Sequence, residues 1–204
     1  TPAALRFNDT ASTVENLAFI DKDPDADELG GMITWQEPEE AGQVIAYVVY
    51  LAASSTGQSR SQIGGDVVIG TNYMFLSLDT QQGPYTHVIV YSKSPFHEQT
   101  TPAALTVTDT NLNVTELEFL DKDLDDLEIG GYITWLPPFD PEGQLVDHAV
   151  FLCNNSAGEG RLLIENVTAG TNIVYVPVDT PRPALTHLAV YSSTSLAEQT
   201  TPEA

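Results

Sequence analysis

The sequence repeats itself with a period of 100 residues, and this repeat limits the folds that the chain can adopt. Thr1-Pro2-Ala3-Ala4-Leu5 returns at 101–105, and the residues 98–102 return at 198–202. Between these anchors one residue is gained and one is lost, because Tyr47 aligns with His148. A shared period with small local shifts is typical of tandem modules that have the same fold.

Most segments of each repeat are predicted to be β-strands. Residues 16–21, 32–36, 45–52, 66–69, 73–78 and 87–92 are rich in Val, Ile, Tyr, Phe and Thr, and Gly, Pro, Asn and Asp lie between them. No segment keeps a helical apolar period over three turns. Short strands at a spacing of about 8–12 residues predict an all-β sandwich. In the last of these strands Val88 and Val90 should face the core, and His87 and Tyr91 the other side.

Several strands resemble those of a known family. Residues 33–38 (Ile-Thr-Trp-Gln-Glu-Pro) and 133–138 (Ile-Thr-Trp-Leu-Pro-Pro) look like the second strand of fibronectin type III domains, in which a core Trp precedes a Pro-rich turn. Residues 46–50 look like the third strand of that family, and 88–92 resemble the sixth. The family's tyrosine corner has no clear equivalent, since only Thr86 or Tyr85 stands near it. The resemblance implies two tandem fibronectin III-like antiparallel β-sandwiches.

The resemblance also implies where each module begins. Residues 101–108 would be the last strand of the first module, so we expect modules at 11–110 and 111–204. Residues 1–10 would then be the last strand of a preceding module, or a strand donated to another chain. The simpler explanation is a longer array that has been cut in mid-module. On either explanation the expected partners are neighbouring copies of the same module, within one chain or by strand donation.

The charge excludes some partners. The 204 residues include 29 acidic and 7 basic side chains, a formal net charge of −22, which repels nucleic acid and anionic membranes. No apolar run reaches the length of a membrane span, and no signal peptide is visible. The single cysteine, Cys153, lies in an apolar run and is expected to be a buried hydrophobic residue. Four Asn-X-Ser/Thr acceptors for glycosylation occur, at Asn8, Asn113, Asn154 and Asn166.

An acidic loop opens each repeat and is the candidate site. Residues 21–28 contain five acidic side chains, and residues 121–128 contain five more. Aspartates at alternate positions resemble the start of a calcium loop. The loop is not an EF-hand, because that motif needs Gly and Glu where this chain has Ala26 and Met32. A set of oxygen ligands without His or Cys favours Ca²⁺ over zinc. The alternative is a solvated acidic turn.

In a sandwich of this kind, the loop between the fifth and sixth strands lies at the same end as the acidic loop. The predicted Ca²⁺ ligands in the first module are therefore Asp21, Asp23 and Asp79, with Asp25 or Asp109 contributing. The predicted ligands in the second module are Asp121, Asp123, Asp125 and Asp179. An ion at each module junction would stiffen the chain.

No catalytic motif appears in the sequence, which has neither a His-Glu-X-X-His nor a Gly-X-Ser-X-Gly pattern. The expected role is not enzymatic: a structural segment of a longer, acidic, extracellular or cell-surface filament or array, stiffened by Ca²⁺. The alternative is an adhesion or glycan-binding module, for which Tyr85, Phe96 and Phe139 are the candidate exposed aromatic residues.

Overall fold

The computed structural model describes residues 2–7, 9–182 and 184–202. Within these ranges the regular elements are β-strands, and none is a helix. The prediction of an all-β fold is confirmed. The strands of the first repeat are β1 (Glu15–Phe19), β2 (Glu28–Gln36), β3 (Ala46–Ala52), β4 (Ser61–Gln62), β5 (Val67–Val68), β6 (Tyr73–Gln81), β7 (His87–Lys93) and β8 (Ala103–Thr106). Those of the second are β9 (Thr115–Phe119), β10 (Glu128–Leu136), β11 (Asp147–Cys153), β12 (Leu162–Thr168), β13 (Ile173–Pro181) and β14 (His187–Ser193).

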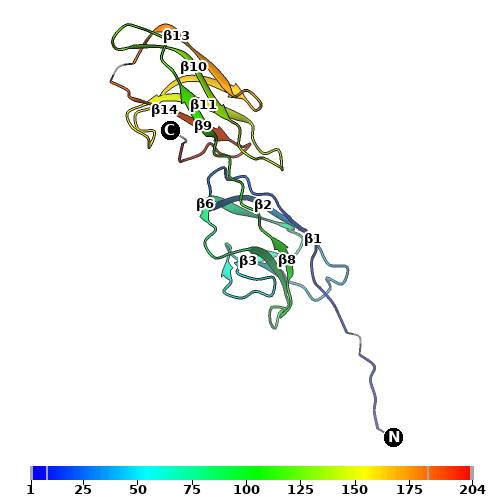
Figure 1. The fold of residues 1–204 in the computed structure, drawn as a ribbon. Helices are drawn as coiled ribbons and strands as arrows, with labels where there is room; N and C mark the ends of the chain where they lie inside the picture. The colour runs from blue at the N-terminus through cyan, green and yellow to red at the C-terminus, as the bar shows by residue number, and fades with distance from the viewer. Residues whose placement is uncertain (1, 8, 183, 203–204) are drawn as a thin grey trace. The chain divides into compact units, whose positions relative to one another are not determined.

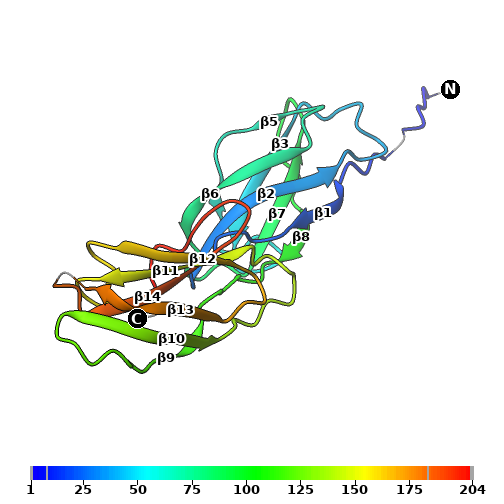
Figure 2. The ribbon, with the colours of Figure 1, turned by 90° about the horizontal axis from the view of Figure 1, so that it is seen from above.

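Each repeat forms two antiparallel sheets. In the first repeat β2 lies between β1 and β6 in one sheet (Figure 1). The other sheet has the order β4-β3-β7-β8, with β5 also paired to β3. In the second repeat β10 lies between β9 and β13, and β11 lies between β12 and β14. Figure 2 shows these two sheets of the second repeat as separate layers. The strand that resembles the family's second strand (β2) thus lies in one sheet. The strands that resemble its third and sixth (β3 and β7) lie in the other, in agreement with the fibronectin III-like prediction.

Buried and exposed side chains alternate along the long strand β2, and the buried ones form part of the sandwich core. Ile33 and Trp35 of β2 are buried, while Met32 and Thr34, which alternate with them, are exposed. The Trp35 ring meets Tyr47 of β3 edge-on, with the ring centroids 5.5 Å apart, so the two sheets are in contact. Full burial of a large apolar side chain stabilises a fold by about 1.5–3 kcal/mol.

The second repeat has the same core with one substitution. Trp135 meets His148 edge-on at 5.4 Å, where the first repeat has a tyrosine. His148 is fully buried; its Nδ1 lies 3.1 Å from Ser192 Oγ, and its Nε2 has no partner. Burial lowers the pKa of His148, because the charged imidazolium loses its hydration. This histidine is thus held neutral inside the sandwich.

In both repeats an arginine covers the outer face of one sheet, the one that contains β3 and β7 in the first repeat and β11 and β14 in the second. The Arg60 guanidinium carbon lies 4.5 Å from the ring centroid of Tyr50 and 4.4 Å from that of Tyr91, and Arg60 pairs with Glu98 at 2.8 Å. Arg161 makes the equivalent contacts with Phe151, Tyr191 and Glu198. Val88 and Val90 face the core as predicted, and Tyr91 on the other face is buried because Arg60 covers it.

Contacts divide the chain into two compact units. The first comprises Thr1–Ile20, Met32–Leu76 and Gln82–Thr108, and the second comprises Asp21–Gly31, Ser77–Gln81 and Asp109–Ala204. The division passes through β2 and β6, so the acidic loop of the first repeat belongs to the second unit. The predicted module boundaries near residues 10 and 110 stay predictions, as does the role of residues 1–10, whose described part lies in no strand.

Within the described ranges, no helix has the length and apolar character that a membrane span needs. Cys153 is buried, as its apolar surroundings predict.

The buried His148 should make the free energy of unfolding of the second sandwich depend on pH. In the unfolded chain His148 protonates below its ordinary pKa of about 6.5, whereas in the folded protein it does so only at lower pH. The contribution of His148 to the free energy of unfolding should therefore fall as the pH drops below about 6.5, by at most about 1.4 kcal/mol per pH unit. His148→Tyr, which installs the residue of the first repeat, should remove this part of the pH dependence. Denaturant unfolding at several pH values measures the difference, and identical pH profiles of the two proteins would contradict the prediction.

Candidate metal centre

Each acidic loop is folded by its own carboxylates. Asp21 Oδ1 accepts hydrogen bonds from the backbone N–H groups of Asp23 at 3.2 Å and Gly30 at 2.8 Å, and Asp23 Oδ1 accepts one from Asp25 N–H at 3.1 Å. Aspartate side chains favour such turns because they reach the backbone two residues further on. Lys22 N–H donates to Gly30 O at 2.7 Å, which closes the loop onto the start of β2. The loop 121–131 repeats all four hydrogen bonds.

A hydrogen bond from β6 brings a further carboxylate to the loop. Asp79 N–H donates to Asp23 Oδ2 at 2.6 Å, and Asp79 adopts a positive φ of 58°. In the second repeat Asp179 N–H donates to Asp123 Oδ2 at the same 2.6 Å, with a φ of 61°. Positive φ is uncommon outside glycine, although aspartate tolerates it better than most residues. The recurrence of this conformation indicates that both repeats hold the aspartate at the loop in the same way.

Two groups of four carboxylates result. Asp23, Asp25, Glu28 and Asp79 each offer one oxygen, and these four oxygens lie within 4.8 Å of one another. Asp123, Asp125, Glu128 and Asp179 form the equivalent group. Both groups could hold a metal ion. We call them the first and the second carboxylate group.

Most of the predicted ligands lie in these groups, but not all of them. Asp21 and Asp121 lie outside, since their oxygens fold the loop instead. Asp109 also lies outside: its Oδ2 accepts the N–H of Asp27 at 3.1 Å, and its Oδ1 is buried without a partner. Glu28 and Glu128 are members that sequence reasoning missed. The signal for them was available, because an acidic residue stands at the same place in both repeats.

The two loops differ in burial. Asp21, Asp23 and Asp25 are only 2%, 1% and 3% exposed, whereas Asp121 and Asp125 are exposed and Asp123 is half-buried. In the second unit Thr110 N–H donates to Asp21 Oδ2 at 2.8 Å. Residues 199–201 also contact this loop, through hydrogen bonds to Pro24 and Asp25. The first loop is therefore shielded from water, and the second is open.

The covering residues bind Asp25 directly. Thr200 N–H donates to Asp25 Oδ2 at 2.7 Å, and Thr201 donates to Asp25 Oδ1 from both its N–H and its hydroxyl, at 3.1 and 2.8 Å. These three hydrogen bonds fix the position of the Asp25 carboxylate, which is a member of the first carboxylate group.

The electrostatic setting favours a cation. Burial raises the pKa of Glu28, and the neighbouring charges of Asp23, Asp25 and Asp79 raise it further. Two ionised carboxylates about 4.8 Å apart repel each other by roughly 3 kcal/mol at an effective dielectric constant of about 20. Glu28 Oε1 accepts a hydrogen bond from Gln81 Nε2 at 2.5 Å, but its Oε2 is buried without a partner. A bound cation would supply the missing partner and reduce the repulsion.

The buried Asp21 is a further carboxylate close to the first carboxylate group. Burial raises its pKa to about 6, although the N–H groups of Thr110, Gly30 and Asp23 oppose the shift. Burial likewise raises the pKa of Asp109, whose charge lies close to Asp27 and Asp23. In the second loop the N–H of Asp179 lowers the pKa of Asp123, because it donates to the ionised carboxylate.

Other predicted features have these positions. Asn154 and Asn166 are exposed, Asn113 is half-buried with its Oδ1 accepting from Gln199 Nε2, and Asn8 lies outside the described residues. Their glycosylation stays a prediction. Of the candidate aromatic residues, Phe96 is 93% and Phe139 86% exposed, and Tyr85 is half-buried.

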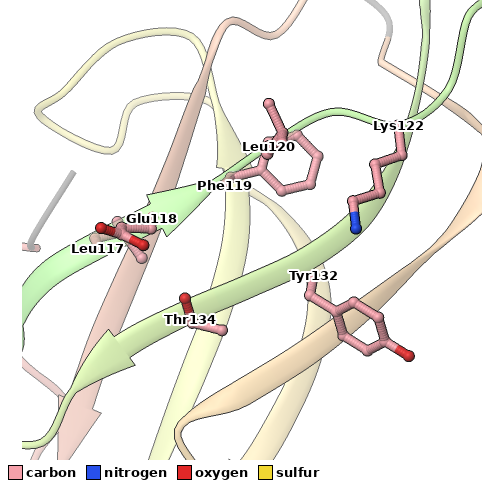
Figure 3. Close-up of a pocket in the computed structure, with 7 residues that line it drawn as sticks. All are labelled: Leu117, Glu118, Phe119, Leu120, Lys122, Tyr132 and Thr134. Carbon is pink, nitrogen blue, oxygen red and sulfur yellow. The ribbon is translucent and has the colours of Figure 1, made fainter.

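A shallow groove of about 530 Å³ lies along β9 and β10. Figure 3 shows Phe119, Lys122 and Tyr132 beside it, with Glu118 further along β9. Tyr132 packs against Tyr175 of β13 with ring centroids 5.1 Å apart, and both rings are about half exposed. The groove therefore combines aromatic and polar side chains on an outer sheet face.

Comparison with known proteins gives a likeness in structure only. No protein-family model matches the chain. No curated protein matches it either. Among solved structures, the chain is similar to the FN1-FN3 domains of chicken CNTN1, with a TM-score of 0.36 and 14% identity over 93% of this chain. The chain spans 64% of the length of that structure.

The close packing at the acidic loop predicts a strict requirement for glycine. A Cβ on Gly30 would lie 2.6 Å from Leu78 Cδ2 and 2.9 Å from Leu78 Cα. Both distances are too short for carbon atoms in contact, and the backbone of β6 cannot easily move away. Gly30→Ala should lower the free energy of unfolding by about 1–3 kcal/mol. Gly65→Ala, where a Cβ meets nothing within 4 Å, is the control and should be neutral or stabilising by up to about 1 kcal/mol. If Gly30→Ala and Gly65→Ala change the free energy of unfolding equally in denaturant unfolding, contact with Leu78 is not what requires glycine at position 30.

Proposed function

We propose that the chain is a structural segment of a longer acidic extracellular array, in which each carboxylate group binds one Ca²⁺. The observation that carries the proposal is the recurrence of the same four-carboxylate group in both repeats, each anchored by a 2.6 Å hydrogen bond from the β6 or β13 aspartate. A solvated acidic turn does not require a fourth carboxylate from a distant strand.

The ligand chemistry supports Ca²⁺ among the common ions. Both groups consist of carboxylates alone, and hard oxygen ligands suit Ca²⁺ and Mg²⁺ better than zinc. Mg²⁺ keeps several waters and demands a near-ideal octahedron, whereas Ca²⁺ accepts six to eight oxygens in flexible geometry. Four carboxylates from one loop and one strand are better suited to the flexible ion.

The ion would join separate parts of the chain. Asp23, Asp25 and Glu28 lie in or beside the loop and Asp79 lies in β6, so a shared ion would tie the loop to that strand. The same loop is bound by Thr110, Thr200 and Thr201 of the second unit. An ion in the first carboxylate group would therefore stiffen the loop where the two repeats follow one another. Its loss would leave four like charges to repel.

An extracellular setting fits this chemistry. Extracellular calcium modules bind with dissociation constants of about 0.1–1 mM, which suits the calcium level outside cells. The net charge of −22 favours solubility and keeps the chain away from polyanions.

A second candidate function is binding of a glycan at the groove on β9 and β10. The half-exposed Tyr132 and Tyr175 offer ring faces on which a sugar can stack, and Glu118, Thr134 and Lys122 offer polar contacts. A glycan array with the wild-type chain and the Tyr132→Ala variant tests this function. Binding that the substitution abolishes would support it, and an array without signal would leave the structural role alone.

Calcium should stabilise the protein measurably. At about 10 mM Ca²⁺, a site with a dissociation constant of about 0.1–1 mM stabilises the folded state by about 1.4–2.7 kcal/mol. For a chain of this size that corresponds to a rise in Tm of about 3–10 °C over the chelated protein. Mg²⁺ at the same concentration should give a smaller shift. Melting curves that do not change between calcium and chelator would remove the ion from the proposal.

Neutralising one of the proposed ligands should affect the stability of the protein in opposite directions with and without calcium. Asp79→Asn removes one of four close charges, so the chelated protein should be as stable as wild type or more so, while the calcium shift should shrink. Asn also tolerates the positive φ at this position. Asp79→Asn combined with Asp179→Asn should abolish the shift altogether.

The matched control is Asp27→Asn. Asp27 lies in the same loop with a φ of 64°, is exposed, and is outside the carboxylate group, so its substitution should preserve the calcium shift. If Asp27→Asn reduces the shift as much as Asp79→Asn, calcium responds only to net charge.

A further inference from the structure

A short segment after β14 connects that strand with the first acidic loop. We call residues 198–201 the return segment, because they turn back along β14. The N–H of Gln199 donates to Ser192 O at 2.9 Å, near the end of the strand. The two residues that follow Gln199 bind the Asp25 carboxylate through their N–H groups. Contacts place both the return segment and the first acidic loop in the second compact unit.

The side chain of Gln199 lies at the centre of this connection. The residue is only 3% exposed. Its Oε1 accepts the N–H of Ser192 at 2.7 Å, and its Nε2 donates to Asn113 Oδ1 at 2.5 Å and, more weakly, to Pro24 O at 3.4 Å. A buried amide is costly unless its polar atoms have partners. Here the partners come from β14, from the residues before β9 and from the acidic loop, so one side chain joins three parts of the unit.

Gln99 is the equivalent residue of the first repeat and shows which of these bonds are general. Its Oε1 also accepts the N–H of Ser92, at 3.1 Å, and its own N–H donates to Ser92 O at 2.9 Å. Among the described residues its Nε2 donates to Thr13 Oγ1, at 3.4 Å, and to no loop carbonyl. The bonds to the serine therefore fold this segment in both repeats, and the bonds of Nε2 distinguish Gln199.

The start of the return segment is also held by Arg161. Its Nη1 lies 2.7 Å from Glu198 Oε1, and its guanidinium carbon lies 4.4 Å from the ring centroid of Tyr191. The side chains of this ion pair are 41% and 37% exposed, and ion pairs that are open to water contribute little stability. The buried carboxamide of Gln199 is therefore the stronger constraint on the position of the return segment.

We propose that Gln199 is a positioning residue that couples the first acidic loop to the sheet of β11 and β14. Its Oε1 holds the return segment against β14 and its Nε2 holds Pro24 O, so that the next two N–H groups face Asp25. Without the carboxamide, the oxygens of Pro24 and Asn113 lose this donor and the loop opens independently of the sheet. The coupling consists of hydrogen bonds within the chain and needs no ion, so it goes beyond the proposed calcium function.

Hydrogen exchange of single amides tests the coupling, with a chelator present throughout so that no divalent ion contributes. Gln199→Met keeps the length of the side chain and removes its polar atoms. The amides of Leu112, Thr200 and Thr201 donate to the loop. Relative to the amides of β11, these three should exchange at least about fivefold faster than in the wild type, because loss of a buried hydrogen bond shifts a local opening equilibrium by such a factor.

The matched control is Gln99→Met. This substitution removes the equivalent bond to a serine but no bond to the loop, so the same three amides should exchange as in the wild type. The proposal is overturned if Gln199→Met leaves the three amides unchanged, or if it accelerates the amides of β11 by the same factor, which indicates a general loss of stability. It is also overturned if Gln99→Met accelerates the three amides as much as Gln199→Met does.

A milder pair of variants keeps the test decisive if Gln199→Met does not fold. Gln199→Asn retains the carboxamide and withdraws it from Pro24 by one methylene group. In denaturant unfolding with chelator, the midpoint shift that it causes should shrink by more than about half in an Asp25→Ala background, because both residues act through the same contact. The shift caused by Gln99→Asn should be equal in both backgrounds. An undiminished shift for Gln199→Asn would mean that Gln199 supports the second sandwich only, which overturns the proposal.

Discussion

The structure of each acidic loop depends on one carboxylate that binds two parts of the backbone at once. Asp23 accepts the N–H of Asp25 with one oxygen and the N–H of Asp79 with the other, and Asp123 does the same with Asp125 and Asp179. These hydrogen bonds fix the loop and the distant strand together. They also force four like charges to share a small volume. The fold therefore creates an electrostatic strain that a divalent cation is suited to relieve.

The two repeats present this arrangement in two environments. In the first carboxylate group Asp23 and Asp25 are buried, whereas Glu28 is half-buried and Asp79 is exposed. Residues 109–112 and 199–201 cover the loop, and Pro24 O accepts the N–H of Leu112 at 3.1 Å. The second group has the same internal hydrogen bonds but is open to water. The loop is thus a preformed unit whose geometry does not require its cover. What the cover changes is the dielectric environment, and with it the strength of every charge interaction in the group.

The sequence predicted the strands, and it named most residues of the two carboxylate groups, whose binding of an ion stays a prediction. Alternation along β2 and the turn residues around it indicate a sandwich strand, and sandwich topology alone brings Asp79 to the loop. Glu28 was missed as a member of the first carboxylate group because it begins β2, and its position was read only as part of a strand. Asp21 was assigned as a ligand because its spacing matches Asp23 and Asp25, although its oxygens serve backbone N–H groups. The burial of the first loop could not be predicted, since it depends on packing with residues more than eighty positions away.

The arginine stacks and the scarcity of basic residues have a consequence for proteolysis. Enzymes that cut after Lys or Arg find only 7 such residues in 204. Arg60 and Arg161 are engaged by aromatic rings and glutamates, Lys93 is paired with Asp66, and Lys22 donates to Ser195. Arg6 and Lys122 are different, because both are exposed in segments that form no strand, which is the kind of site that proteases prefer. A trypsin-like protease should therefore cut first after Arg6 or Lys122 and spare the strands of both sandwiches.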